Sequence, residues 1–281
     1  MYRHSIRFYS IVLLLLLISI LTSCRNRDNK MIARGNIEFQ KKNYEEALLY
    51  YKKALKINPN SWEAYYDMAL CKANLGNDTG AINDYSNAAK INPRENVNIY
   101  INRGDLYYKI KDFEKAIADY KFAIELNPSN FDLYLALGSS YRNLKNYDDA
   151  IKNLKIALEH NSSMVKAYSE LGYIYLVQKN YPLAIEFLDK GIAIDSTDAI
   201  MFNNRANAKL ELKDIAGAIA DINKSMSLDS KNSYAYKIKA LILIAQNKKA
   251  EACVELKKSL SLGYTEKYGN EVSELLKQYC E

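Results

Sequence analysis

Apolar residues recur three and four positions apart from residue 28 onward, and short polar turns interrupt them at regular distances. The turns divide the chain into seven segments of 34 residues, with one spacing of 35, which begin at residues 28, 62, 97, 131, 165, 199 and 233. Each segment holds two stretches with helical periodicity, one near positions 2–14 and one near positions 17–30. The pattern predicts seven antiparallel helix pairs and no β-sheet.

Three positions in every segment hold a small residue. The eighth is Gly or Ala, the twenty-seventh is Ala, Gly or Ser, and the twentieth is Ala47, Ala81, Ala116, Ala150, Ala184, Ala218 and Ala252. Helix axes usually pack about 8–10 Å apart, and small residues at the contact let them approach more closely. We therefore expect positions 8 and 20 to lie between the two helices of a pair, and position 27 to contact the next pair.

This arrangement resembles the tetratricopeptide repeat, over residues 28 to about 266. The resemblance implies an all-α fold, a right-handed superhelical α-solenoid of about seven repeats, with the array spanning 31–266 and a capping helix at 267–281. One departure concerns the proline that ends each repeat. It is present as Pro59, Pro93 and Pro128 but is replaced by Ser162, Ser196, Ser230 and Tyr264, so we expect the later turns to be looser.

The N-terminus has the pattern of an export signal. Arg3 and Arg7 precede an apolar run over residues 11–21, whose helical length of about 17 Å is too short for a bilayer core of about 30 Å. The following Leu21-Thr22-Ser23-Cys24 resembles the lipobox of bacterial lipoproteins. That resemblance implies a signal peptide over 1–23, a lipidated Cys24 and a tether over 24–30. Arg25 in place of aspartate favours the outer over the inner bacterial membrane.

Little in the composition suggests catalysis. The chain has 2 histidines, of which only His160 follows the signal, and it contains no glycine-rich phosphate loop and no GxSxG or HExxH motif. The net charge of +6 is spread along the chain, which argues against nucleic-acid binding. We therefore expect no enzyme activity, no catalytic or metal-binding residue, no cofactor and no small-molecule substrate.

Two cysteines near the C-terminus form a candidate disulfide. Cys253 begins the second helix of the last pair, and Cys280 ends the expected capping helix. Antiparallel packing brings the beginning of one helix next to the end of the other, and an exported protein can oxidise such a pair. The alternative is two free buried thiols.

The resemblance also implies a binding surface. In this family, positions 2, 5, 9, 12 and 13 line a concave groove. The main candidates here are Tyr66, Tyr108, Leu135, Arg142, Tyr173, Leu176, Asn203 and Asn207. Asparagine and tyrosine can hydrogen-bond to a polypeptide backbone while leucine contacts its side chains. The pattern by which some family members bind C-terminal carboxylates is absent, since Ile32 stands where a lysine is required.

These features favour a membrane-anchored scaffold or adaptor whose partners are other proteins, bound as peptide or helix segments. One alternative is an assembly factor for outer-membrane or secretion machinery. A second is an enzyme or enzyme subunit, and a third is a passive spacer without a ligand. Only the chemistry of the site separates them, because one fold hosts many functions.

Overall fold

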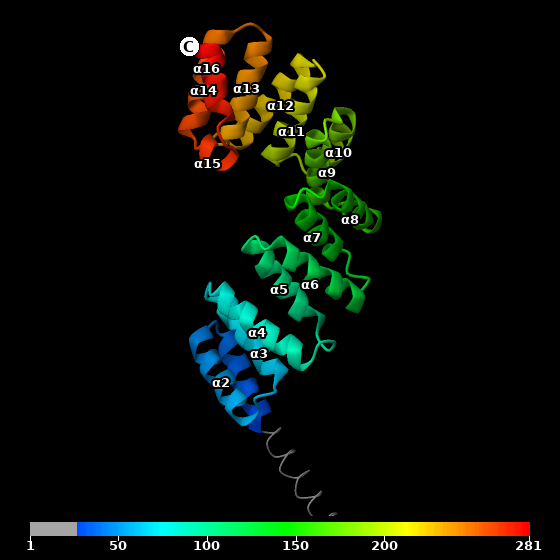
Figure 1. The fold of residues 1–281 in the computed structure, drawn as a ribbon, viewed down its shortest axis with the longest axis vertical. Coiled ribbons are helices and arrows are strands. Elements are labelled where there is room, and N and C mark those ends of the chain that lie inside the picture. The colour runs from blue at the N-terminus through cyan, green and yellow to red at the C-terminus, as the bar shows by residue number, and fades with distance from the viewer. Residues whose placement is uncertain (1–26) are drawn as a thin grey trace, which may run out of the picture. The chain divides into compact units, whose positions relative to one another are not determined.

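The computed structural model describes residues 27–281, and every regular element in that range is helical (Figure 1). The chain divides into two compact units, unit 1 up to Leu133 and unit 2 from Tyr134 onward. None of the helices between residues 27 and 281 has the length and apolar character that crossing a membrane requires. The expected signal peptide and Cys24 lie outside the described residues.

Unit 1 contains the first three helix pairs. They consist of a helix over 27–40, α2 (Tyr44–Ile57), α3 (Trp62–Asn74), α4 (Asp78–Ile91), α5 (Val97–Lys109) and α6 (Phe113–Leu126). The second helix of each pair occupies the predicted positions 17–30 of its segment. The helical periodicity of the sequence therefore locates these helices correctly.

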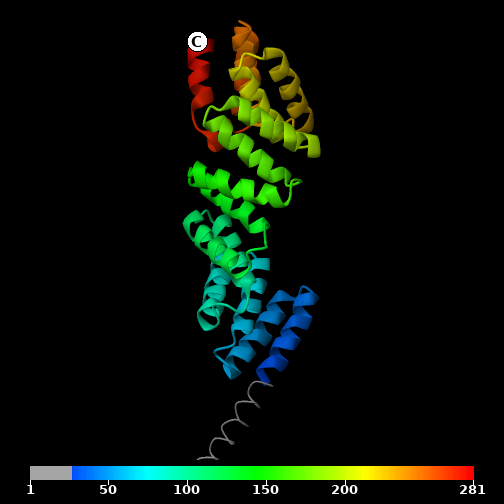
Figure 2. The same cartoon turned by 90° about the vertical axis from the view of Figure 1, so that its right-hand side faces the viewer.

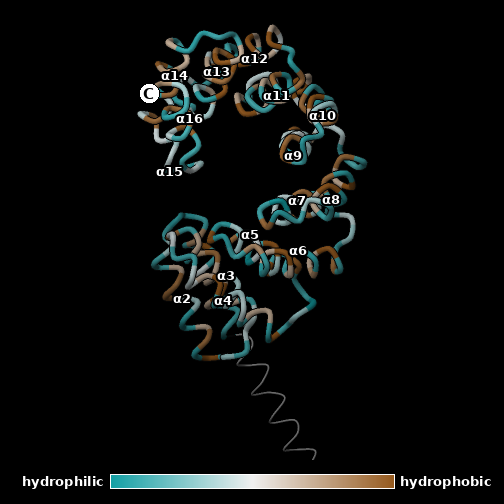
Figure 3. The backbone as a smooth tube through the Cα atoms, turned by 45° about the horizontal axis from the view of Figure 1, so that its top comes forward, coloured by the Kyte–Doolittle hydropathy of each residue, from teal (hydrophilic) through white to brown (hydrophobic). Residues whose placement is uncertain are grey.

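Unit 2 contains the remaining four pairs and the C-terminal cap. Its helices are α7 (Asp132–Asn143), α8 (Tyr147–His160), α9 (Val165–Val177), α10 (Tyr181–Ile194), α11 (Ala199–Glu211), α12 (Ile215–Leu228), α13 (Ser233–Ala245), α14 (Lys249–Ser261), α15 (Tyr264–Tyr268) and α16 (Glu271–Cys280). Hydrophobic and hydrophilic residues alternate along these helices (Figure 3), as expected where one face of each helix is buried. The predicted α-solenoid of helix pairs is confirmed.

The small residues lie where two helices touch. All seven alanines at position 20 are completely buried. A Cβ atom added to Gly172, at position 8, would lie 2.5 Å from Cγ of Leu188 at position 24, and one added to Gly35 would lie 2.4 Å from the ring of Tyr51. The side chain at position 24 therefore fills the space that glycine leaves open, and the expected role of position 8 is confirmed.

The turn inside each helix pair has a left-handed residue at position 15, which the sequence analysis did not predict. It is Gly76 in one repeat, but Lys42, Lys111, Lys145, Lys179, Lys213 and Asn247 in the others, with φ between 60° and 65°. In repeat 5, the backbone N–H groups of Lys179 and Asn180 donate to the carbonyls of Leu176 and Tyr175. These two hydrogen bonds close the end of the helix and hold Lys179 in its unfavourable left-handed conformation.

The turns at Pro59 and at Ser162 have the same hydrogen bonds, although only the first contains proline. In the turn that contains Pro59, the N–H of Asn58 donates to Ala54 and its side-chain oxygen accepts from the N–H of Asn60. In the turn without proline, Asn161 makes the equivalent bonds with Ala157 and Ser163. The Asn side chain thus makes the same bonds in these two turns with and without proline, and the expected loosening is not seen between them.

The C-terminal cap differs from the predicted single helix over 267–281. A short helix, α15, precedes α16, and the two are separated at Gly269, whose φ of 88° interrupts the helix. Val272 of α16 is fully buried against the last repeat, together with Leu275 and Leu276. Cys253 of α14 and Cys280 of α16 form a disulfide with Cα atoms 5.8 Å apart. Figure 1 shows α16 lying beside α14.

Candidate functional site

A cavity of about 470 Å³ lies within unit 2. Helices α9, α10, α11, α13, α15 and α16 contribute to its wall, and Figure 2 shows this part of the chain from a second direction. The lining residues are Tyr173, Leu176, Val177, Lys179, Tyr181, Ile200, Asn203, Asn204, Asn207, Glu211, Asn232, Tyr234, Tyr264, Tyr268 and Glu271. Four predicted groove residues, Tyr173, Leu176, Asn203 and Asn207, are thereby brought together.

The central polar group of this cavity is the side chain of Asn203. Only 2% of Asn203 is exposed, and its Oδ1 atom has no hydrogen-bond partner in the described part of the chain. A buried amide oxygen without a partner costs roughly 1–3 kcal/mol, which is why such groups are rare in folded proteins. Oδ1 of Asn203 is thus buried in the wall beside the cavity, without a donor from the described chain.

Tyrosines form one side of the cavity. The ring centroids of Tyr264 and Tyr268 on α15 lie 4.9 Å apart, and that of Tyr234 on α13 lies 5.4 Å from Tyr268. Asn207 donates a hydrogen bond of 3.0 Å from Nδ2 to the hydroxyl of Tyr234. Burial raises the pKa of Tyr234 to about 12, so these phenols are neutral at physiological pH and present uncharged aromatic faces.

Glu271 is held in the wall by two contacts. Its carboxylate forms an ion pair with Nζ of Lys237 at 2.7 Å and accepts a hydrogen bond from the hydroxyl of Tyr264 at 2.8 Å. Burial alone would raise the pKa of Glu271, but Lys237 and Tyr264 outweigh it and keep the pKa below its usual value. Glu271 is thus a carboxylate that already has its cation.

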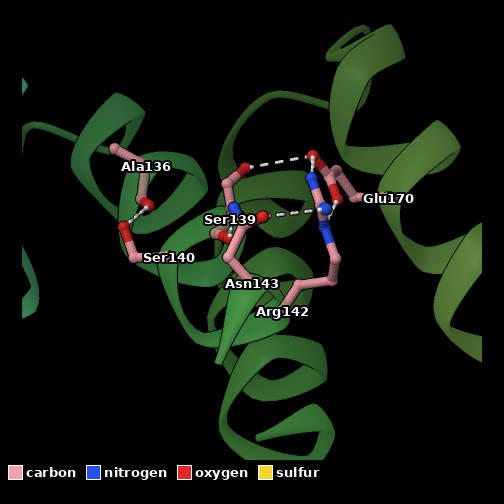
Figure 4. Close-up of polar contacts among 6 residues, drawn as sticks. All are labelled: Ala136, Ser139, Ser140, Arg142, Asn143 and Glu170. Atoms are coloured by element: carbon pink, nitrogen blue, oxygen red, sulfur yellow. Dashed lines mark hydrogen bonds and ion pairs between the residues drawn. The ribbon is translucent and has the colours of Figure 1, made fainter. Parts of the chain in front are cut away.

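Arg142, predicted as a groove residue, is held by a neighbouring repeat. Its guanidinium contacts Glu170 through Nε at 2.6 Å and Nη2 at 3.0 Å, and Ser139 donates a further hydrogen bond to Glu170 (Figure 4). The guanidinium of Arg142 also lies over the ring of Tyr173, with its Cζ atom 5.7 Å from the ring centroid. Arg142, Glu170 and Tyr173 line a second cavity of about 230 Å³, which shares Ile200 and Asn204 with the first.

The other predicted groove residues do not line these cavities. Leu135 is half-buried on α7. Tyr66 and Tyr108 belong to unit 1, where the hydroxyl of Tyr66 accepts a hydrogen bond of 3.3 Å from Asn102 and the ring of Tyr108 packs against Phe113. The two cavities therefore contain the C-terminal members of the predicted set, from Arg142 onward, and none of the N-terminal ones.

Several wall residues were not predicted. Ile200 occupies position 2, one of the groove positions, and is 58% exposed, so the repeat frame itself could have identified it. Tyr268 was missed because it falls in the range predicted as a capping helix, and Tyr264 because it was considered only as a replacement for the repeat-ending proline. Their spacing of four residues between Gly263 and Gly269 places both on one face of a short helix, and this was the available signal.

The described residues contain no group of three or more His, Cys, Asp or Glu side chains able to hold a metal ion. His160 is exposed at the last position of α8. The cavity combines aromatic faces, amides and apolar side chains, a set suited to non-covalent recognition.

Family models match most of the chain. Models described as tetratricopeptide repeat match residues 63–95, 97–130, 135–199 and 199–232, and one described as TPR repeat matches residues 35–76. Three of these segments, 63–95, 97–130 and 199–232, coincide with single repeats of the 34-residue period to within one residue, whereas 135–199 spans two repeats and 35–76 overlaps the first two.

Curated relatives resemble one third of the chain. Hsp70-Hsp90 organizing protein 3 of Arabidopsis thaliana is 29% identical over 97 residues, which are 34% of this chain and 17% of that protein. Small glutamine-rich tetratricopeptide repeat-containing protein 2 of Mycosarcoma maydis is 31% identical over 98 residues, 35% of this chain and 28% of that protein. The chain thus spans less than a third of the length of these relatives.

Solved structures resemble the fold over a greater length. A tetratricopeptide repeat protein from Parabacteroides merdae ATCC 43184 has a TM-score of 0.66 at 24% identity, covering 90% of this chain and 99% of that one. YrrB, described as a TPR protein with an unusual peptide-binding site, has a TM-score of 0.58 at 18% identity, covering 67% and 97%. With the repeat period, the helix pairs and the matching models in agreement, this chain belongs to the tetratricopeptide-repeat family.

Proposed function

We propose that this chain is a membrane-anchored scaffold or adaptor that binds a peptide or helix segment of a partner protein in the cavity of unit 2. The observation that carries the proposal is a cavity of about 470 Å³ whose wall includes the large, exposed side chains of Ile200, Tyr173 and Tyr268.

The surface around Asn203 supports a polypeptide ligand. Ile200, Tyr173 and Tyr268 are 58%, 40% and 51% exposed, although they are large and apolar or aromatic. Exposed aromatic residues next to an amide are common where proteins bind segments of other proteins. The resemblance to YrrB, described as a TPR protein with an unusual peptide-binding site, agrees with this choice.

A photo-crosslinking amino acid placed at Tyr268 tests the proposal in membranes of cells that express the full chain. We expect specific partner proteins to be captured from this position, and Ile200→Asp in the same chain should abolish their capture. The matched control is Val254→Asp, because Val254 is 65% exposed on α14 and does not line the cavity. Circular dichroism first establishes that both variants fold.

Capture that survives Ile200→Asp would place binding elsewhere, and absence of capture would favour the passive-spacer alternative. The assembly-factor alternative predicts the same loss and differs in the partners, which would then be outer-membrane or secretion components. The enzyme alternative predicts turnover that is independent of this cavity.

The anchoring part of the proposal rests on the lipobox-like Leu21-Thr22-Ser23-Cys24. Mass spectrometry of the mature chain should find an N-terminal Cys24 carrying acyl chains, and Cys24→Ser should move the protein from the membrane to the soluble fraction. An unprocessed N-terminus on the membrane-bound protein would contradict the lipoprotein hypothesis. Separation of outer from inner membranes then tests the expected outer-membrane location.

A further inference from the structure

The three carboxylates around the two cavities of unit 2 differ in whether a cation pairs with them. Glu170 has Arg142 as its cation, with N–O distances of 2.6 and 3.0 Å, and Glu271 has Lys237 at 2.7 Å. Glu211, at the end of α11, accepts only a hydrogen bond from the hydroxyl of Tyr181 at 3.4 Å and forms no ion pair with any residue of the described chain.

The two cations already present follow one geometry. Arg142 lies over the ring of Tyr173 at 5.7 Å, and Lys237 lies over the ring of Tyr234 at 5.3 Å. In each case a cation contacts an aromatic face of the cavity wall and a carboxylate at the same time. A positive charge held between a ring and a carboxylate gains from both, because the ring face is the negative end of its quadrupole.

Two acceptors of the wall, Oδ1 of Asn203 and the carboxylate of Glu211, have few or no donors. Nδ2 of Asn207 donates to Tyr234, the hydroxyl of Tyr264 donates to Glu271, and that of Tyr181 donates to Glu211. Oδ1 of Asn203 has no donor within the described chain. A ligand that satisfies these two acceptors must bring hydrogen-bond donors, and lysine and arginine side chains bring three and five N–H donors without any acceptor.

We infer that the cavity of unit 2 selects a lysine or arginine side chain of the bound polypeptide. Its methylene groups would contact Leu176, Val177 and Ile200. Its charged end would reach the carboxylate of Glu211, the faces of Tyr173 and Tyr268 and, once the amide of Asn203 turns over, its Oδ1. The inference rests on the proposed function, since it specifies which segment of a partner the cavity accepts.

Lys179 is the wall residue that opposes a cationic ligand. It is exposed at the mouth of the cavity, in the left-handed turn after α9. Because like charges repel at short range, Lys179 provides a test of sign. Its removal strengthens the binding of a cation and weakens that of an anion.

The test uses four small probes of similar length, the Nα-acetyl methylamides of lysine, arginine, norleucine and glutamate, added to the full chain with ¹³C-labelled tyrosine rings. We expect the two cationic probes to shift the NMR signals of Tyr173, Tyr234 and Tyr268 saturably, with apparent Kd at least threefold lower than norleucine. Glu211→Gln and Asn203→Leu should each weaken the cationic probes at least threefold, while Lys179→Gln should strengthen them. Glu251→Gln, an exposed carboxylate of α14 outside the cavity, is the matched control.

Equal binding of norleucine, or cationic binding that neither Glu211→Gln nor Lys179→Gln alters, would overturn the inference. Glu211 and Lys179 are exposed, so these variants fold even if Asn203→Leu does not. If partner proteins are captured at Tyr268 but the cavity shows no preference for cationic probes, the proposed function is supported and only this inference is contradicted.

Discussion

Glu170 of α9 accepts two hydrogen bonds from the guanidinium of Arg142 on α7, and thereby joins repeat 5 to repeat 4 (Figure 4). Removing one member leaves the other charge without its partner in a largely buried place, which typically costs about 3–5 kcal/mol in a core and less here, where a quarter of the Arg142 side chain is exposed. We expect Glu170→Leu to lower the free energy of unfolding by about 1–3 kcal/mol, measured by urea denaturation. Arg142→Met in the same chain should recover most of that loss, and purely additive losses would show that the pair is not a unit.

Gly172 and Leu188 provide a test of the packing. A Cβ at residue 172 would overlap Cγ and Cδ2 of Leu188, at 2.5 and 2.6 Å. Gly172→Ala should therefore lower the free energy of unfolding by about 1–3 kcal/mol, as overpacked sites usually do. Leu188→Ala creates space, so adding Gly172→Ala to it should cost nothing further. Thermal melts of the four chains give the answer, and equal costs in both backgrounds would contradict the proposed contact.

The disulfide between Cys253 and Cys280 closes a loop with a sequence separation of 27. Cross-linking a loop of this size restricts the unfolded chain and contributes roughly 3–4 kcal/mol in the chain-entropy model. Replacing both cysteines by serine, or reducing the bond, should lower the melting temperature of unit 2 by several degrees. Hydrogen exchange should accelerate most in α15 and α16. Unchanged exchange there would mean that packing alone holds the cap.

Asp67 on α3 makes stability depend on pH. Burial, and to a smaller extent repulsion by Glu63, raise its pKa to about 7, whereas an aspartate in an unfolded chain titrates near pH 3.9. Between these values the folded state binds more protons than the unfolded state, so this residue lowers stability as the pH rises from about 4 to 7.

Asp67→Asn removes that titration. We expect the variant to match the natural chain near pH 3.5 and to exceed its free energy of unfolding by at least about 1 kcal/mol at pH 8. Urea denaturation at intervals of one pH unit resolves the difference. Glu63→Gln should recover only a small part, because burial is the larger cause. A constant difference across the range would show that Asp67 ionises normally.

Most of the fold could be predicted because one signal recurs seven times. Ala184 and its equivalents, spaced by one repeat, locate the second helix of every pair, and small residues are needed there for a packing reason that the sequence displays directly. Position 15 could not be predicted in the same way. Lys145 and Lys213 adopt the left-handed conformation, although lysine has no preference for it, because the hydrogen bonds of the turn and the following helix determine it together.

The site could be predicted only in part. Tyr173, Leu176, Asn203 and Asn207 were found because the repeat frame assigns a face to each position. The place of Tyr268 in the cavity wall was not predicted, because no repeat frame applies beyond residue 266 and because that place depends on the bend at Gly269. The pairing of Arg142 with Glu170 also escaped, since the partner comes from the next repeat and both residues are ordinary surface types when read singly.

The disulfide has a consequence for how the cavity survives damage. Residues 253–280 form a covalent ring that includes Tyr264, Tyr268 and Glu271, three residues of the cavity wall. A protease that cuts this ring once, for example beside Gly269, opens it but releases nothing. The severed end stays attached through Cys280, so the wall can refold against the last repeat. Two routes of covalent connection therefore keep this side of the cavity wall in place, where the rest of the described chain has one.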